Sequence, residues 1–151
     1  MEVQHIARVV FDEDLPTYET SGGVHRGDDG KVTSPATMWC EALELAVQRL
    51  ADLTDLSDIV AVSGSGQQHA TVYLSEKGVT ALEALDPARP LVRQFDGCFA
   101  RASPAWLDTS TGQECAELEE AAGRSGRFFP PNVMPSFFPY FKRNGSPRRR
   151  R

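Results

Sequence analysis

The chain has 151 residues, of which 40% are hydrophobic and 25% are charged, and its formal net charge is −5. This length suits one folded domain, no apolar stretch approaches the roughly 18 residues of a membrane span, and the N-terminus does not resemble a cleaved signal. The three cysteines, Cys40, Cys98 and Cys115, are too widely spaced for a disulfide framework or a CxxC motif, so we expect a soluble cytoplasmic protein.

The first third of the chain predicts a strand, a turn region and a long helix. Ile6–Phe11 is an apolar run that ends at three acidic residues, as a strand does when it leaves a sheet. Glycine-rich turns follow over residues 22–30. Ser34–Pro35 then suits the N-cap and first position of a helix that runs to about Leu53. Apolar residues recur along this helix at the spacing of one face, which places Trp39 in the core.

A polar turn lies between two apolar runs that are rich in β-forming residues. The runs Asp58–Val62 and Ala70–Leu74 predict strands, and Ser63–His69 between them reads Ser-Gly-Ser-Gly-Gln-Gln-His. The glycines let the backbone turn sharply or let a ligand approach, and the Gln-Gln-His end offers hydrogen-bonding groups suited to a sugar. The local pattern leaves a plain hairpin with a polar turn equally open.

Two glycine and serine motifs from enzymes do not fit this turn. A dinucleotide-binding fingerprint needs a third glycine where His69 stands, and a helix after it. A serine hydrolase elbow needs a glycine where Ser63 stands, and also a helix after the serine. We therefore set both interpretations aside.

The chain from the second predicted strand to residue 123 predicts shorter elements. Glu76–Gly78 suits a turn, and residues 82–99, which two prolines interrupt, suit a loop with short helical pieces. Ala105–Leu107 is a short strand candidate. Ser110–Gln113 has the form of a capping box, which opens a helix that Gly123 ends. Strands that alternate with helices favour an α/β fold.

The last 28 residues differ in composition from the rest of the chain. Residues 1–123 hold all 21 acidic groups and eight basic ones, a balance of −13, whereas residues 124–151 hold eight basic groups and no acidic group. The same tail contains five of the ten prolines and five of the eight phenylalanines, without a helical or strand period. We expect one domain over residues 1–123 and a basic, disordered tail over residues 124–151.

Several short stretches in register resemble the eukaryotic branch of the xylulokinases, within the FGGY carbohydrate kinases. They occur in family order across about residues 8–122, and they are Val10–Pro16, Gly22–His25, Thr33–Pro35 with Met38–Trp39, Ser63–His69 and Ser103–Thr111. Each stretch is weak by itself, and the series in register is what carries the resemblance.

This resemblance implies an actin-like, ribonuclease-H-like fold, of which the chain would hold part of the N-terminal domain. In such a kinase two domains enclose a cleft in which ATP and magnesium meet a ketopentose, and the γ-phosphoryl group passes to the O5 hydroxyl of the sugar. The resemblance implies a substrate contact for His69, with Gln68 as a weaker neighbour, and makes Asp108 a further candidate. Ala70 stands where glycine is common in the family.

Other elements of the family have no match in this sequence. Its phosphate-binding turn would precede Val10, where Met1–Gln4 leave no room for it, and its catalytic aspartate would lie downstream of this chain. No residue that flanks Arg143 agrees with the segment that bears the family's sugar-contacting arginine. We therefore expect no catalytic residue and no metal ligand here, and a fragment with weak activity or none.

Two other functions stay open at this point. A truncated, non-catalytic product would bind a full-length partner through an unpaired sheet edge. A binder of nucleic acid or another anionic surface would use Lys142, Arg143 and Arg148–Arg151, but the acidic body and the lack of a nucleic-acid-binding fold argue against it. We expect a small ketopentose as partner, no nucleic acid and no membrane, and the sequence does not predict the oligomeric state.

Overall fold

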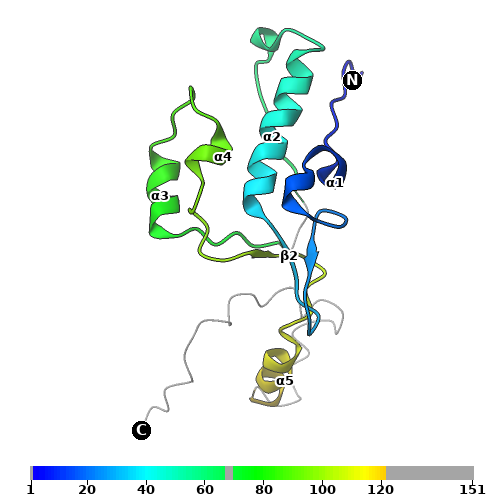
Figure 1. Cartoon of the computed structure of the whole chain (residues 1–151), viewed down its shortest axis with the longest axis vertical. Helices are drawn as coiled ribbons and strands as arrows, with labels where there is room; N and C mark the ends of the chain where they lie inside the picture. The colour runs from blue at the N-terminus through cyan, green and yellow to red at the C-terminus, as the bar shows by residue number, and fades with distance from the viewer. Residues whose placement is uncertain (1, 67–69, 122–151) are drawn as a thin grey trace.

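The computed structural model describes residues 2–66 and 70–121. Its elements in chain order are α1 (Phe11–Asp14), η1 (Pro16–Tyr18), β1 (His25–Arg26), β2 (Val32–Ser34), α2 (Ala36–Ala51), η2 (Leu56–Asp58), α3 (Glu76–Glu83), α4 (Leu91–Gln94), β3 (Ser103–Pro104) and α5 (Gly112–Ala121). The three strands form one antiparallel sheet in the order β1-β2-β3. This short sheet lies between the group α1 to α4 and the single helix α5 (Figure 1).

The helix predicted from Pro35 to about Leu53 is confirmed as α2, but its cap differs from the prediction. Pro35 is the N-cap, with an extended backbone and no side-chain cap bond. Ser34, which was expected to cap the helix, is buried in β2, where its hydroxyl donates to the Gly23 carbonyl at 2.7 Å. Because the backbone of Ser34 pairs with Ser103 in β3, the residue belongs to the sheet and not to the helix end.

The core is small and lies against the first half of α2. Met38 is fully buried, Ala42 is nearly so, and Leu15 packs with them from the connection between α1 and η1. Burial of each large apolar side chain of this kind contributes about 1.5–3 kcal/mol to stability. Partly buried apolar residues surround the cluster: Val9, Phe11, Tyr18, Trp39 and Leu45. The prediction that Trp39 packs in the core is confirmed.

Three of the predicted strands are wrong. Ile6–Phe11 forms no strand, and its last residue opens α1. Asp58–Val62 forms none either, and Ala70–Leu74 contributes only an isolated bridge between Leu74 and Phe99. A β-strand needs a continuous ladder of backbone pairs with a neighbour, and within residues 2–66 and 70–121 these runs form no such ladder. Their β-forming composition is therefore not enough.

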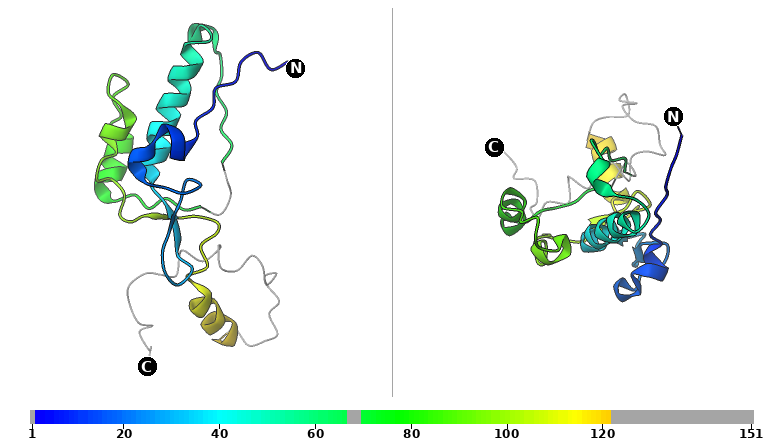
Figure 2. Two further views of the ribbon diagram at one scale, coloured as in Figure 1. Left: turned by 45° about the vertical axis from the view of Figure 1, so that its right-hand side comes forward. Right: turned by 90° about the horizontal axis from the view of Figure 1, so that it is seen from above.

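The turn predicted at Glu76–Gly78 is also wrong, because these residues open α3. Ser75 is the N-cap, and its hydroxyl accepts a hydrogen bond from the Gly78 N–H at 3.2 Å. Gly78 allows α3 to approach the segment after α4, since an added Cβ would clash with the Cys98 carbonyl oxygen. The prediction of a loop with short helical pieces is confirmed by α4, which packs against α2, as both views of Figure 2 show.

The third strand begins two residues earlier than predicted. β3 consists of Ser103–Pro104, whereas the sequence indicated Ala105–Leu107. Ala105 still contacts the sheet, because its N–H donates to the Val32 carbonyl at 2.9 Å. The chain then turns, with the Asp108 N–H donating back to the Ala105 carbonyl at 3.0 Å.

The helix predicted after Ser110 is confirmed as α5 (Gly112–Ala121). Gly123, its predicted terminator, and the tail over residues 124–151 lie outside the described residues. The coarse prediction of an α/β protein is confirmed by the sheet and its helices. Across the part of the chain that the structure describes, no helix has the length and apolar content that crossing a membrane requires.

Candidate functional site

The two residues predicted to contact a sugar, Gln68 and His69, lie outside the described residues. Their role stays a prediction, and what the structure describes is the chain on either side of them. After the turn, the Thr71 N–H donates to the Pro104 carbonyl of β3 at 3.4 Å. The segment that leaves the polar turn is therefore held against the edge of the sheet.

The glycines before these residues lie in open surroundings. A Cβ added to Gly64 or to Gly66 would meet no other heavy atom within 4 Å, and neither residue has a positive φ. Backbone conformation therefore does not require glycine at either position. What glycine provides here is free space next to the backbone, which suits the approach of a ligand.

Asp108, the third candidate, is buried and holds the loop before α5 against β2. One carboxylate oxygen accepts a hydrogen bond from the Val32 N–H at 2.9 Å. The other oxygen accepts from the Ser110 N–H at 3.1 Å and from the Ser110 hydroxyl at 2.7 Å. Hydrogen bonds to a charged acceptor are among the stronger ones in proteins. These contacts give Asp108 a structural role, and a contact with a ligand stays a prediction.

Asp12 organises the turn between α1 and β1. Its carboxylate accepts hydrogen bonds from the Thr20 hydroxyl at 2.7 Å, from the Gly22 N–H at 2.6 Å and from the Gly23 N–H at 3.1 Å. The bond from Thr20, followed by those from the two glycine amides, lowers the pKa of Asp12. The carboxylate is therefore charged at neutral pH and holds a turn that begins ten residues later in the sequence.

The turn that Asp12 holds requires glycine for two reasons. Gly22 and Gly23 have φ values of +66° and +75°, in the left-handed region that other residues rarely adopt. A Cβ on Gly23 would also lie 2.6 Å from the ring of Phe11. In addition, the Gly23 carbonyl accepts the hydroxyl of Ser34 in β2. The turn is thereby fixed to the helix on one side and to the sheet on the other.

Tyr18 connects the same region to α2. Its hydroxyl donates to the carboxylate of Glu41 at 2.7 Å, and its backbone carbonyl lies 2.7 Å from Nε2 of His25. Burial of the ring, and then the hydrogen bond to Glu41, raise the pKa of Tyr18 to about 12. His25, for which no functional role is predicted, is an exposed residue of β1.

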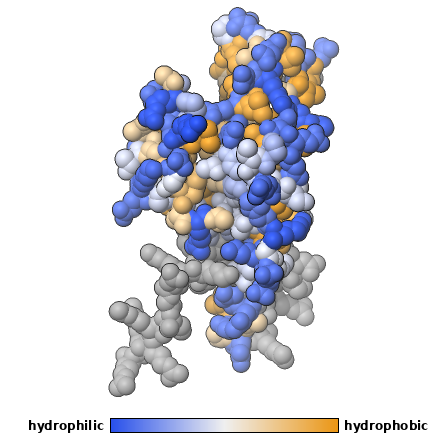
Figure 3. All heavy atoms as spheres, in the orientation of Figure 1, coloured by the Kyte–Doolittle hydropathy of each residue, from blue (hydrophilic) through white to orange (hydrophobic). Residues whose placement is uncertain are grey.

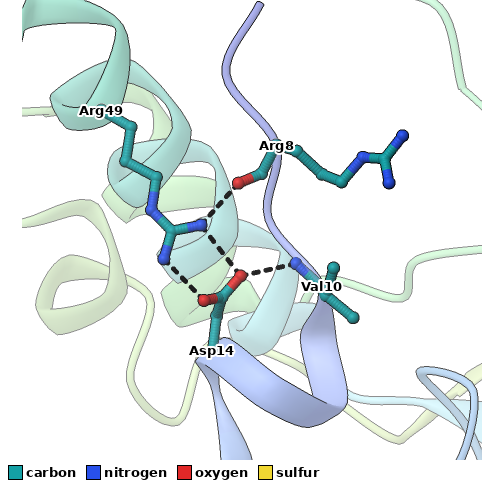
Figure 4. A network of polar contacts seen from close by, with 4 residues as sticks. All are labelled: Arg8, Val10, Asp14 and Arg49. Carbon is teal, nitrogen blue, oxygen red and sulfur yellow. Dashed lines mark hydrogen bonds and ion pairs between the residues drawn. The ribbon is translucent and has the colours of Figure 1, made fainter.

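A bidentate ion pair between Asp14 and Arg49 fixes α1 to α2 (Figure 4). The two nitrogens of the guanidinium lie 2.9 and 2.6 Å from the two carboxylate oxygens of Asp14. Arg49 also donates to the Arg8 carbonyl, and Asp14 accepts the Val10 N–H at 2.7 Å. The hydrogen bond from Arg49, with that from Val10, lowers the pKa of Asp14 to about 2.

These contacts bring four of the five stretches that resemble the kinase family into one unit, which we call the β2 junction. It consists of Asp12, the Gly22–Gly23 turn, β2 with the start of α2, and Asp108. Residues up to 76 positions apart meet in it. Thr71, which follows the fifth stretch in the sequence, donates its N–H to Pro104 of β3 in the same sheet.

Sequence reasoning did not identify Asp12 or Ser34 as key residues of this region. The available signal for Asp12 was an acidic residue ten positions before a Gly-Gly pair, which by itself does not distinguish a turn-binding carboxylate from a solvated one. Ser34 carried a helix-cap signal that concealed its place in the strand. Both roles depend on contacts between segments that a single sequence does not display.

The described residues do not bring together the side chains that a metal ion needs as ligands. Among residues 2–66 and 70–121, no group of three or more His, Cys, Asp or Glu side chains is placed to hold a metal ion. The carboxylates of Asp12, Asp14 and Asp108 already accept hydrogen bonds from the protein. These three carboxylates hold loops in place, and we assign no step of phosphoryl transfer to them.

Comparison with known proteins gives a consistent result. No family model matches the chain. Xylulose kinase 2 of Arabidopsis thaliana is 44% identical over 119 residues, which cover 76% of this chain and 21% of the plant protein. Xylulose kinase of Mus musculus is 44% identical over 118 residues, covering 76% of this chain and 21% of the mouse protein. Xylulose kinase of Schizosaccharomyces pombe is 41% identical over 123 residues, covering 82% of this chain and 22% of the yeast protein.

The similarity therefore extends over most of this chain and a small part of each relative. The chain spans about a fifth of the length of the curated relatives that it matches. The plant, mammalian and yeast proteins all carry the same functional name, which agrees with the family that the motifs indicate. The chain is homologous to a segment of the xylulose kinases.

Proposed function

We propose that this sequence supplies the sugar-facing part of a xylulose kinase of the FGGY type, which phosphorylates D-xylulose with ATP. The observation that carries the proposal is the 44% identity over 119 residues to a xylulose kinase. The α/β sheet with its flanking helices is compatible with part of a ribonuclease-H-like domain. Under this proposal, the matched segment contributes substrate recognition, and the γ-phosphoryl donor and its magnesium are held elsewhere in such a kinase.

The proposal divides the site into a binding turn and its support. His69, with Gln68, hydrogen-bonds the hydroxyl groups of the sugar, since imidazole and amide groups both donate and accept. The open space beside Gly64 and Gly66 supports this role, because it admits a ligand close to the backbone. Asp108 acts as a positioning residue, since it fixes β2 and the loop next to the sheet edge that Thr71 contacts.

Phosphoryl transfer depends on positioning and on stabilising charge with metal ions and cationic groups. Among the described residues, no group of His, Cys, Asp or Glu side chains is placed to hold a metal ion. We therefore expect the 151-residue chain by itself to bind D-xylulose weakly and to phosphorylate it slowly or not at all. The alternative of an anionic-surface binder rests on the basic tail, which lies outside the described residues. No observation favours it over the kinase assignment.

Titration of D-xylulose into the purified chain, followed by NMR or calorimetry, tests the binding role. His69→Ala should weaken binding by about tenfold, the effect of losing one hydrogen bond of about 1.4 kcal/mol. His5→Ala is the matched control, because His5 is an exposed histidine outside the β2 junction, and it should leave the affinity unchanged. Equal affinity of wild type and His69→Ala would remove His69 from the site.

A parallel assay of ATP-dependent phosphorylation tests the reaction. Little or no turnover of D-xylulose by this chain is expected, together with measurable binding of the sugar. Turnover at the rate of the full-length Arabidopsis enzyme under the same conditions would contradict our expectation that this chain holds no catalytic residue. Preferential binding of a different sugar would contradict the proposed substrate.

A further inference from the structure

Residues 70–75, which we call the arm, connect the polar turn to α3 and lie alongside the segment that follows α4. At the α3 end of the arm, the N–H and the hydroxyl of Ser75 both donate to the Cys98 carbonyl, at 2.8 and 3.0 Å. Further along, the Ala100 N–H donates to the Tyr73 carbonyl at 2.8 Å. In Figure 1 the two segments run side by side from α3 and α4 to the sheet. The arm is therefore held along its length by backbone pairing.

The pairing of the arm changes register before it reaches the sheet. Tyr73 lies opposite Ala100, and Thr71 donates its N–H to the Pro104 carbonyl at 3.4 Å. Between these two contacts the arm advances by two residues and the facing segment advances by four. Residues 101–103 therefore form a β-bulge with two extra residues. Bulges bend a strand, redirect its side chains and are frequent next to active sites.

Both ends of this bulge are held in place. Ser103, its last residue, is fully buried and pairs with Ser34 of β2. Arg101, its first residue, reaches across to the arm, where its guanidinium carbon lies 3.9 Å from the centroid of the Tyr73 ring. A cation over the face of an aromatic ring at this distance is attracted to it. The Arg101 side chain thus joins the bulge to the arm.

The arm has little other support from the core. Among the described residues, the core cluster around Met38 comes from other segments, and Val72 of the arm is 44% exposed. Figure 3 shows apolar residues of one face gathered towards the end of α2, whereas the arm joins the sheet beside β3, at the level where α2 begins. The arm therefore depends on its backbone pairing and on the contact between Arg101 and Tyr73.

The position of the arm restricts where the polar turn can lie. Two residues of chain span at most about 7 Å, so the residue two positions before Thr71 stays within that distance of it. That residue is His69, the predicted sugar contact. We propose that Arg101 is a positioning residue for the sugar site, because by holding Tyr73 it fixes the arm and so restricts the position of His69. This inference rests on the proposed function.

Titration of D-xylulose into the full 151-residue chain tests the proposal. Arg101→Ala should weaken binding by about two- to fivefold, the range that an exposed cation–π contact supplies. Tyr73→Leu should weaken it by a similar factor, and the double variant should bind no more weakly than either single variant, because both remove the same contact. Arg93→Ala is the matched control, since it removes a positive charge from an exposed position on α4, and it should leave the affinity unchanged.

The C2 proton of His69 provides a second readout that does not need the sugar. The chain has three histidines, and His69→Ala identifies the NMR signal of His69 by its loss. Arg101→Ala should shift this signal in the free chain and leave the signals of His5 and His25 unchanged. A general loss of structure would also shift His25, whose Nε2 lies 2.7 Å from the Tyr18 carbonyl oxygen, and that result would overturn the proposal.

The results separate a failure of this inference from a failure of the proposed function. If His69→Ala weakens sugar binding and Arg101→Ala does not, the proposed function stands and Arg101 is not a positioning residue. If the wild-type chain does not bind D-xylulose, the proposed function fails, and an unchanged His69 signal in Arg101→Ala would overturn this inference as well. A loss of more than about tenfold in Arg101→Ala would show that the guanidinium contacts the sugar itself, which contradicts a positioning role.

Discussion

Two short segments of this chain that contain β-branched residues have very different surroundings. Val32–Ser34 is paired on both edges, by β1 and by β3, and its first residue is also bound by the buried carboxylate of Asp108. Ile59–Val62 has no pairing partner among the described residues, and Val60 is almost fully exposed. The comparison shows that β-forming residues permit a strand, whereas neighbours elsewhere in the sequence decide whether one forms.

The stability of the β2 junction should respond most strongly to a side chain at Gly23. In Gly23→Ala, alanine must adopt a left-handed backbone conformation, and its Cβ comes too close to the ring of Phe11. We expect the free energy of unfolding to fall by about 2–5 kcal/mol. A Cβ at Gly64 would meet no neighbour, and Gly64 has no positive φ, so Gly64→Ala should not destabilise the chain. Urea unfolding of both variants measures the difference, and equal losses would contradict the contrast between the two regions.

Asp108→Asn should have the next largest effect. The amide keeps the volume of the side chain but removes its charge and replaces one acceptor oxygen with a donor, which leaves the Val32 N–H or the Ser110 groups poorly paired. We expect a loss of about 1–3 kcal/mol in the free energy of unfolding. Asp52→Asn, at an exposed position after α2, should change it by less than about 0.5 kcal/mol. If the two variants unfold alike, Asp108 does not hold the junction.

The ion pair of Asp14 with Arg49 should make a smaller contribution that depends on pH. The pKa of Asp14 is about 2 in the folded chain and about 3.9 when unfolded, so its stabilisation is present above about pH 4 and is lost as the pH falls to about 2. Asp14→Asn lacks this contribution, so its deficit relative to wild type should be largest at neutral pH and should shrink in acid. Denaturation curves across this range measure it, and a deficit that grows in acid would contradict the assignment.

The smallest effect on stability is expected for Val60→Lys. Because this side chain is 99% exposed, its replacement should change the stability of dilute protein by no more than about 0.5 kcal/mol. Thermal or urea unfolding at low concentration measures this value. A large loss would show that Val60 is buried within the monomer, and the contrast with the β2 junction would then fail.

The sequence predicted the elements whose signals are local. The apolar spacing of α2 and the polar start of α5 are properties of neighbouring residues, and both helices form close to their expected bounds. The turn expected at Glu76–Gly78 failed because Ser75 supplies a helix cap that its strand-like neighbours concealed. The strands expected at Ile6–Phe11 and Asp58–Val62 failed because pairing is not a local property.

The candidate site was predictable only in part, for the same physical reason. Motif resemblance indicated the family, and the similarity to xylulose kinases agrees with it. Motif resemblance also singled out Asp108, but its hydrogen bonds with Val32 and Ser110 are seen only in the folded chain. Asp12 and Ser34 hold the glycine turn through contacts with groups far away in the sequence. No local sequence pattern therefore predicts their roles.

Hydrogen exchange of the isolated chain at low protein concentration tests the central contrast most directly. The amides of Gly22, Gly23 and Val32 donate to carboxylates in the β2 junction, so they should exchange slowly and with similar protection. The amides of residues 60–66 have no acceptor among the described residues, so they should exchange at rates close to those of an unfolded peptide. Equal protection of the two regions, or faster exchange in the junction, would contradict this account.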